Sequence, residues 1–169
     1  MEKRFIISIL VENKYGVLMR VTSMFTRRGF NIDSLSVGIT ESPEYSRITV
    51  TMTGDEYAKQ QMVSQLGKLY NVKKVEVLED AEAVRRELIL VKVKNDPDNH
   101  QRLLSSLDIF KARILNYSTE VLSIECTGSP NKIDAFVEMV RPLGIIELCR
   151  TGLVAMHKGK EGSLTNIEQ

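Results

Sequence analysis

The side chains that most often carry enzymatic chemistry are few and scattered in this sequence of 169 residues. The two histidines, His100 and His157, stand at no metal-ligand or catalytic-triad spacing from a cysteine, serine or carboxylate. The two cysteines, Cys126 and Cys149, form no C-x-x-C pair and fall within apolar, strand-like runs, which predicts buried thiols in a reducing compartment. The sequence therefore predicts no catalytic residue and no metal site.

One stretch does offer binding chemistry. In "VENKYGVLMRV", residues 11–21, an apolar run ends and a helical pattern begins directly after Gly16. A glycine here lets the backbone approach a ligand, because no Cβ stands in the way. The amides of Gly16, Val17 and Leu18 would form a helix N-terminus that attracts a carboxylate, and the amide of Asn13 could bind either charged group of a zwitterion. Taken alone, a glycine at this position is more often a tight turn.

The elements that must position this loop follow from hydrophobic periodicity. The first half of the chain predicts strand, helix, strand, strand, helix, strand, over residues 4–12, 17–28, 30–39, 46–53, 55–69 and 71–79. A change of alternation within 30–39 predicts a bulge near Asp33 and Ser34, and Asp55 is expected to cap the second helix.

After a polar stretch the same order returns. The second half predicts the elements 87–94, 96–110, 112–118, 120–128, a helix with Ser129 as N-cap and Pro130 at its first position, and a last strand over 145–156. The predicted fold class is α+β, with two ferredoxin-like βαββαβ domains in tandem. We expect domains at 1–79 and 87–158, a linker at 80–86 and a polar tail at 159–169. Uncovered sheet faces and edges predict self-association.

The composition excludes several classes of partner. The chain has 23 Lys and Arg residues and 22 Asp and Glu residues. This balance gives no excess of positive charge for binding nucleic acid or an anionic membrane. The hydrophobic share of 43% is enough for packed cores, and no apolar run is long enough to cross a bilayer. The sequence predicts a soluble, cytoplasmic protein.

The stretch "LVENKYGVLMRVTSMFTRRGFNIDSLSVGITESPEYSRITVT" closely resembles the ACT domain of the small, regulatory subunits of acetolactate synthase (acetohydroxyacid synthase). The shared pattern is E-N-x-x-G-x-L-x-R-V, F-x-x-R-G-[FY]-N-I-[DE]-S-L and an S-R-[IM]-T strand. "RELILVKV", "NKIDAFVEMVRPLGIIELCRTGLVAM" and a trailing "KG" match the C-terminal domain of that family, so the resemblance covers nearly the whole chain.

The resemblance implies that two ACT domains pair side by side and bind valine at the seam. The polar end of valine would be held from one chain by Asn13, Gly16, Val17 and Leu18. Asn31 and Ile32 would approach from the other chain. The second domain, whose "VKNDPDNHQRLL" has aspartates and no glycine at the equivalent junction, is not expected to hold a valine site of this kind.

The resemblance further implies a non-catalytic subunit of branched-chain amino acid biosynthesis, the pathway to isoleucine and valine. It would bind and activate the catalytic large subunit and confer feedback inhibition by valine. This chain would bind no cofactor of its own, and thiamine diphosphate, Mg and FAD would belong to the catalytic partner.

Two other functions share features of this sequence. An acylphosphatase-like hydrolase has the same βαββαβ order, but it needs a phosphate-cradling arginine in the first strand-helix loop, where this chain has Lys14 and no arginine before Arg20. A free-standing amino-acid sensor acting on DNA would need a helix-turn-helix or a basic surface, and the sequence predicts neither.

Overall fold

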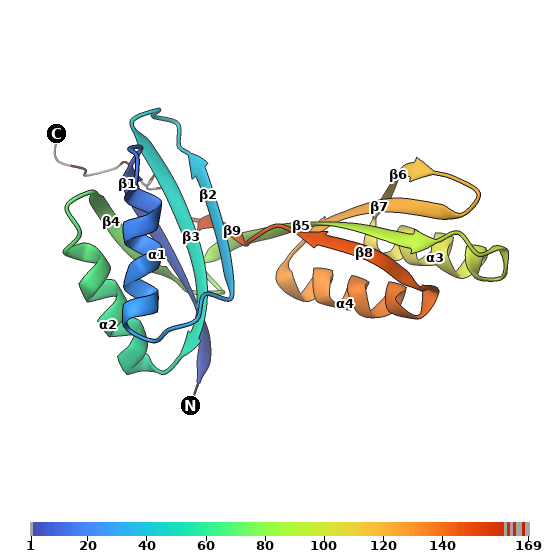
Figure 1. The fold of residues 1–169 in the computed structure, drawn as a ribbon, viewed down its shortest axis with the longest axis horizontal. Helices are drawn as coiled ribbons and strands as arrows, with labels where there is room; N and C mark the ends of the chain where they lie inside the picture. Colours follow the sequence, from blue (N-terminus) through green and yellow to red (C-terminus); the bar gives the residue numbers. More distant parts are fainter. Residues whose placement is uncertain (1, 161, 163, 165–166, 168–169) are drawn as a thin grey trace. The chain divides into compact units, whose positions relative to one another are not determined.

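The computed structural model describes residues 2–160, 162, 164 and 167. The chain divides into two compact units (Figure 1). The first unit comprises Met1–Val84 and Gly152–Gln169, and the second comprises Arg85–Thr151. Each unit has one antiparallel sheet with two helices packed on one face, which confirms the predicted α+β class with tandem βαββαβ order.

The first unit has the strand order β2-β3-β1-β4, so that β2 and β4 are its edges. Its elements are β1 (Lys3–Glu12), α1 (Val17–Arg27), β2 (Ser34–Ile39), β3 (Tyr45–Gly54), α2 (Glu56–Gly67) and β4 (Val72–Leu78). The N-cap predicted for α2 is confirmed, because the Asp55 carboxylate accepts a hydrogen bond of 2.7 Å from the Ala58 amide.

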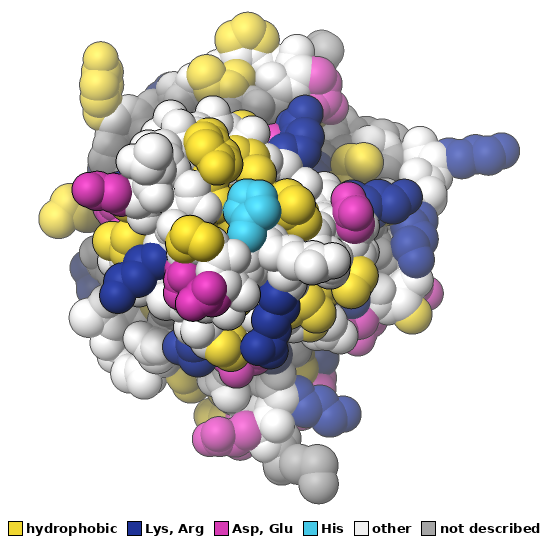
Figure 2. Space-filling model, turned by 90° about the vertical axis from the view of Figure 1, so that its right-hand side faces the viewer, with side chains coloured by type: hydrophobic (Ala, Val, Ile, Leu, Met, Phe, Trp, Pro, Cys, Tyr) yellow, Lys and Arg dark blue, Asp and Glu magenta, His cyan; other side chains and the backbone are white. Residues whose placement is uncertain are grey.

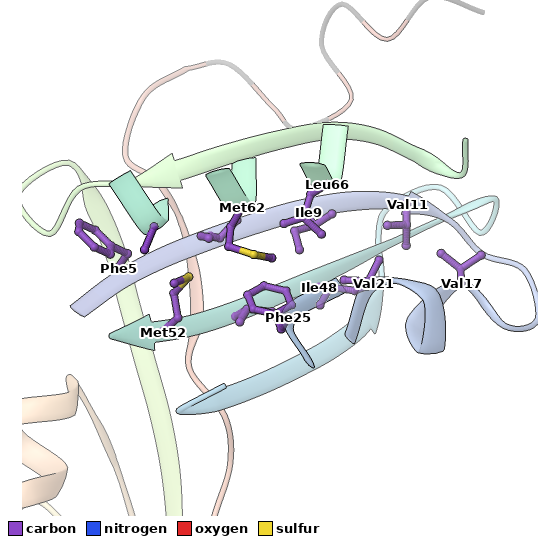
Figure 3. Close-up of a cluster of buried hydrophobic side chains, with 13 residues drawn as sticks. Phe5, Ile9, Val11, Val17, Val21, Phe25, Ile48, Met52, Met62 and Leu66 are labelled. Carbon is purple, nitrogen blue, oxygen red and sulfur yellow. The ribbon is translucent and has the colours of Figure 1, made fainter. Parts of the chain in front are cut away.

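The core of the first unit lies between the sheet and its two helices. Every second residue of β1, from Phe5 to Val11, faces α1 and α2 (Figure 3). The apolar stripe of α1, formed by Val17, Val21 and Phe25, is buried against them. Burial of this stripe fixes where α1 begins, and thereby the position of the loop between Glu12 and Val17.

The second unit has the strand order β6-β7-β5-β8. Its elements are β5 (Ala83–Lys94), α3 (His100–Phe110), β6 (Arg113–Tyr117), β7 (Val121–Gly128), α4 (Pro130–Val140) and β8 (Ile145–Arg150), with short 3₁₀ turns at Pro97–Asn99 and Arg141–Leu143. Ser129 caps α4 and Pro130 occupies its first turn, as predicted.

The two compact units divide the chain at other points than the predicted domains do. The expected linker 80–86 is not a linker throughout, because β5 already begins at Ala83 and this side chain is buried. The expected last strand 145–156 is two strands, β8 and β9 (Val154–His157), and the second belongs to the first unit. The predicted tail 159–169 lies partly outside the described residues.

The last strand, β9, is placed with the first unit by a small second core, which lies on the face of the first sheet that its helices leave open. Leu153 and Ala155 are buried there together with Ile6, Leu78 and Ala83. The chain thus covers much of the sheet face that the sequence predicted to be uncovered.

Two local predictions were wrong. No bulge occurs near Asp33, because β2 starts at Ser34 and pairs with β3 in unbroken register; Phe30 and Ile32 precede the strand and pack against the core. Cys126 is buried as predicted, but Cys149 is exposed. Cys149 lies on the edge strand β8, opposite Leu90, which is itself exposed on the face away from the helices.

Within the described residues, no helix combines the length and apolar character that a bilayer crossing requires.

Candidate functional site

The loop between β1 and α1 ends in an open helix N-terminus. Gly16 is the N-cap of α1 with φ of 77°, in the left-handed region that favours glycine, and no side chain caps the helix. The first intrahelical bond runs from the Arg20 amide to the Gly16 carbonyl at 3.1 Å. The Val17 amide makes one long bond of 3.4 Å to the Lys14 carbonyl, and the amides of Gly16 and Leu18 have no partner within the described part of the chain. These donors and the positive end of the helix dipole can receive an anion.

Asn13 stands at the start of this loop and is held by the turn between β2 and β3. Its backbone amide donates to the Glu44 carbonyl at 2.7 Å, and its side-chain Nδ2 donates to the Pro43 carbonyl at 3.0 Å. The side-chain oxygen of Asn13 has no partner among the described residues and can accept a hydrogen bond from an ammonium group.

The two apolar residues predicted for this group differ in what they can offer. Val17 is buried in the core, so that only its backbone amide is available at the loop. Leu18 is 41% exposed, and its side chain can contact an apolar ligand group.

Asn31 and Ile32 come after the C-terminal end of α1 at Arg27, whereas Gly16 caps its start. The helix has 11 residues, which at about 1.5 Å per residue separates its two ends by roughly 16 Å. Asn31 is exposed, and Ile32 is half-buried against the core. One copy of the chain therefore does not bring the two predicted groups of residues together.

Sequence reasoning missed a charged network behind the loop. Glu12, the last residue of β1, forms ion pairs with Lys14 and Lys73, both at 2.9 Å, and accepts a hydrogen bond of 2.7 Å from Asn71 Nδ2. The hydrogen bonds from Lys14, Lys73 and Asn71, in that order, lower the pKa of Glu12 from its ordinary 4.5 to about 2. The same carboxylate raises the pKa of Lys14 and Lys73. The pairing of Glu12 with Lys14, two residues further on, could have been predicted from the sequence. The hydrogen bond between Glu12 and Asn71 could not, because these residues are 59 positions apart.

A groove lies elsewhere on the first unit. It has a volume of about 740 Å³ and is lined by Ser8, Arg47, Lys74, Glu76 and His157 among others, on the sheet face away from α1 and α2. None of the six predicted site residues lines it. The described residues also hold no cluster of three or more His, Cys, Asp or Glu side chains suited to a metal ion. The predicted site is thus an exposed set of donors rather than a closed pocket.

Comparison with known families agrees with the two-domain organisation. A family model described as an AHAS small subunit-like ACT domain matches residues 7–74. A second model, described as the small subunit of acetolactate synthase, matches residues 86–159.

Individual relatives extend over almost the whole chain. The chain is 42% identical over 156 residues to the acetolactate synthase small subunit of Mycolicibacterium smegmatis, with 92% of each protein covered. It is 47% identical over 156 residues to a probable acetolactate synthase small subunit of Methanothermobacter thermautotrophicus, covering 91% of this chain and 92% of the relative. The crystal structure of the acetolactate synthase small subunit from Thermotoga maritima superimposes with a TM-score of 0.86 at 36% identity, covering 94% of this chain and 99% of that one. With identity, coverage and fold in agreement, this chain belongs to the family of acetolactate synthase small subunits.

Proposed function

We propose that this chain is the regulatory subunit of an acetolactate synthase. In this proposal it binds and activates the catalytic large subunit and confers feedback inhibition by valine in branched-chain amino acid biosynthesis. The single observation that carries the valine site is the uncapped start of α1, where Gly16 in a left-handed conformation leaves backbone amides open to a carboxylate. Thiamine diphosphate, Mg and FAD are assigned to the catalytic partner, and this chain performs no chemical step.

Valine would be bound by both of its charged groups. The carboxylate would accept hydrogen bonds from the amides of Gly16, Val17 and Leu18, and the free oxygen of Asn13 would accept one from the ammonium group. The exposed part of Leu18 would contact the isopropyl group. Because these donors and acceptors are largely uncharged, a neutral zwitterion suits them better than a free anion does.

The site would be completed by a second copy of the chain. A two-fold axis that sets two α1 helices antiparallel brings the start of one helix near the end of the other, and with it Asn31 and Ile32 of the second copy. The free edge of β2 supports such a pairing. Its residues Ser34–Ile39 include no charged side chain, and Val37 and Ile39 are 46% and 66% exposed. The other edge, β4, carries Lys73, Lys74 and Glu76, which discourage pairing.

Inhibition follows from linkage between valine binding and the quaternary state of the complex with the catalytic subunit. Valine can lower activity only if it binds more tightly to the quaternary state in which the catalytic subunit is less active, and that state must in turn bind valine more tightly.

The structure gives less support to the alternatives. In an acylphosphatase-like enzyme, an arginine would have to face the first loop, but the guanidinium of Arg20 donates to Asn71 Oδ1 at 2.8 Å. A sensor that binds DNA would need a continuous basic area. The face shown in Figure 2 mixes hydrophobic, basic and acidic side chains instead.

The experiment that tests this proposal compares Gly16→Asp with Gly16→Asn in a reconstituted complex with the catalytic subunit. Both variants place a side chain in a left-handed position, where Asp and Asn are tolerated better than most residues, and an added Cβ meets no atom within 4 Å. Only Asp adds a negative charge beside the ligand carboxylate. We expect both complexes to keep their stimulated acetolactate formation, and Gly16→Asp to need far more valine for inhibition than Gly16→Asn.

If valine inhibits the Gly16→Asp complex as strongly as the wild type, Gly16 is only a turn residue. If stimulation is lost together with inhibition, the loop contacts the catalytic subunit instead of valine.

A further inference from the structure

Asn71 connects the two elements that bracket the loop of the proposed valine site. Its side-chain oxygen Oδ1 accepts a hydrogen bond of 2.8 Å from Arg20 Nη1, and its Nδ2 donates one of 2.7 Å to Glu12 Oε2. Its backbone carbonyl accepts a third, of 2.9 Å, from the Glu12 amide. Asn71 itself is only 8% exposed.

These partners have fixed places on either side of the loop. Glu12 is the last residue of β1, and Arg20 is the fourth residue of α1. The whole loop between β1 and α1, including Asn13 and Gly16, is therefore spanned by one side-chain amide. Because the amide is planar and both of its polar atoms are engaged, it fixes the distance between the strand end and the first turn of the helix.

An asparagine suits this position for a chemical reason. The group must accept from a guanidinium and donate to a carboxylate at the same time, and a primary amide does both. An aspartate would keep the acceptor for Arg20, but it would set a second carboxylate against Glu12. An apolar residue would leave Arg20 without this acceptor, and Glu12 would keep only its ion pairs with Lys14 and Lys73.

We propose that Asn71 is a positioning residue for valine. Resting on the proposed function, this inference states that Asn71, through Glu12 and Arg20, holds the amides of Gly16, Val17 and Leu18 in the geometry that receives the carboxylate. Asn71 does not touch the ligand.

The test exchanges the two interacting groups. Asn71→Asp alone removes the donor to Glu12 and creates a carboxylate pair. In Asn71→Asp combined with Glu12→Gln, the glutamine amide can donate to the new carboxylate at position 71, while Arg20 still donates to the other oxygen of that carboxylate. The double variant thus restores both side-chain hydrogen bonds of position 71 with the direction of one reversed, although it removes the ion pairs of Glu12 with Lys14 and Lys73. Asn131→Asp, an exposed change in the first turn of α4, is the matched control.

Valine affinity of each full-length protein is measured by calorimetry, and folding is followed by circular dichroism. We expect Asn71→Asp to fold and to bind valine about tenfold more weakly, which corresponds to the loss of one charge-assisted hydrogen bond. The double variant should recover most of that loss, and Asn131→Asp should bind as the wild type does. If Asn71 had only a structural role, Asn71→Asp would lower the thermal stability followed by circular dichroism and leave the valine affinity of the folded protein unchanged.

Three results would overturn the inference while leaving the proposed function intact: undiminished affinity in Asn71→Asp, equal weakness in the single and double variants, or an equal loss in Asn131→Asp. If the wild-type protein itself fails to bind valine, the proposed function fails first, and the inference falls with it.

Discussion

Gly152 lies directly against the backbone of Leu35. A Cβ at Gly152 would stand 2.2 Å from the Leu35 carbonyl oxygen and 3.0 Å from the Ser36 amide nitrogen. The next residue, Leu153, donates from its amide to Ser34 Oγ at 3.4 Å. The C-terminal segment of the first unit therefore rests on β2, the strand that follows Asn31 and Ile32, and only glycine permits this approach.

Gly152→Ala should destabilise the first unit, because the obstacle is backbone and cannot rotate away. The cost of such overpacking is about 1–3 kcal/mol, visible as a lower midpoint of urea denaturation. Gly67→Ala is the matched control, since a Cβ at the end of α2 meets no atom within 4 Å and alanine favours a helix. An unchanged midpoint for Gly152→Ala would mean that residues 152–153 do not rest on β2 in solution.

The contact of Gly152 illustrates what the sequence could not predict. Local signals were sufficient for the type and order of most elements and for the starts of α2 and α4, because the capping side chains of Asp55 and Ser129 act within three residues of themselves. The place of β9 depends instead on Leu153 and Ala155 reaching Ile6, which lies near the other end of the chain. Periodicity carries no information about such pairings, so the sequence did not predict that β9 packs with the first unit.

The candidate site shows the same contrast between local features, which the sequence predicts, and long-range contacts, which it does not. The open helix start at Gly16 followed from a glycine at a strand-helix junction, and the structure adds that Val17 is buried and can offer only its backbone. The network of Glu12 and Asn71 was missed because its members are 59 positions apart. The exposure of Cys149 was missed because an alternating pattern does not reveal whether a strand is central or at an edge.

The edge of β2 leads to a prediction about assembly. Val37→Lys places a charge on a strand that is otherwise uncharged and half exposed, which is how natural sheets prevent edge pairing. We expect the wild type to sediment as a dimer, the variant to shift toward monomer, and valine binding to decline with it. Tyr57→Lys, which replaces an exposed aromatic residue on α2, should leave both properties unchanged. A dimeric Val37→Lys protein with normal valine affinity would exclude β2 as the seam.

The pKa of Glu12 predicts how stability depends on pH. Its pKa is about 2 in the folded chain against an ordinary 4.5, so the unfolded chain binds more protons between these values. The stabilisation by this carboxylate is therefore fully present above about pH 4.5 and is lost as the pH falls toward 2. Glu12→Gln cannot titrate, so its melting temperature should lie below that of the wild type at neutral pH and approach it as the pH nears 2. A gap that stays constant over this range would show that Glu12 is not held by Lys14, Lys73 and Asn71 in solution.

Asn31 tests whether the valine site spans two chains. Its side chain is exposed at the end of α1 distant from Gly16, so truncation should leave the fold of the single chain intact. If Asn31 of a second copy binds a charged group of valine, Asn31→Ala removes a hydrogen bond worth roughly 1.5–3 kcal/mol, which lowers affinity about ten- to a hundredfold. Asn131→Ala, on an exposed turn of α4 in the second unit, is the control for the same truncation.

Calorimetry on mixed dimers gives a sharper test, because a dimer of one Asn31→Ala chain and one Gly16→Asp chain keeps a single intact seam site. In that dimer one site carries both substitutions and the other carries neither, so half of the valine should bind with wild-type affinity. If both sites of the mixed dimer are weakened instead, Asn31 and Gly16 do not meet across the seam, and each site is built from one chain.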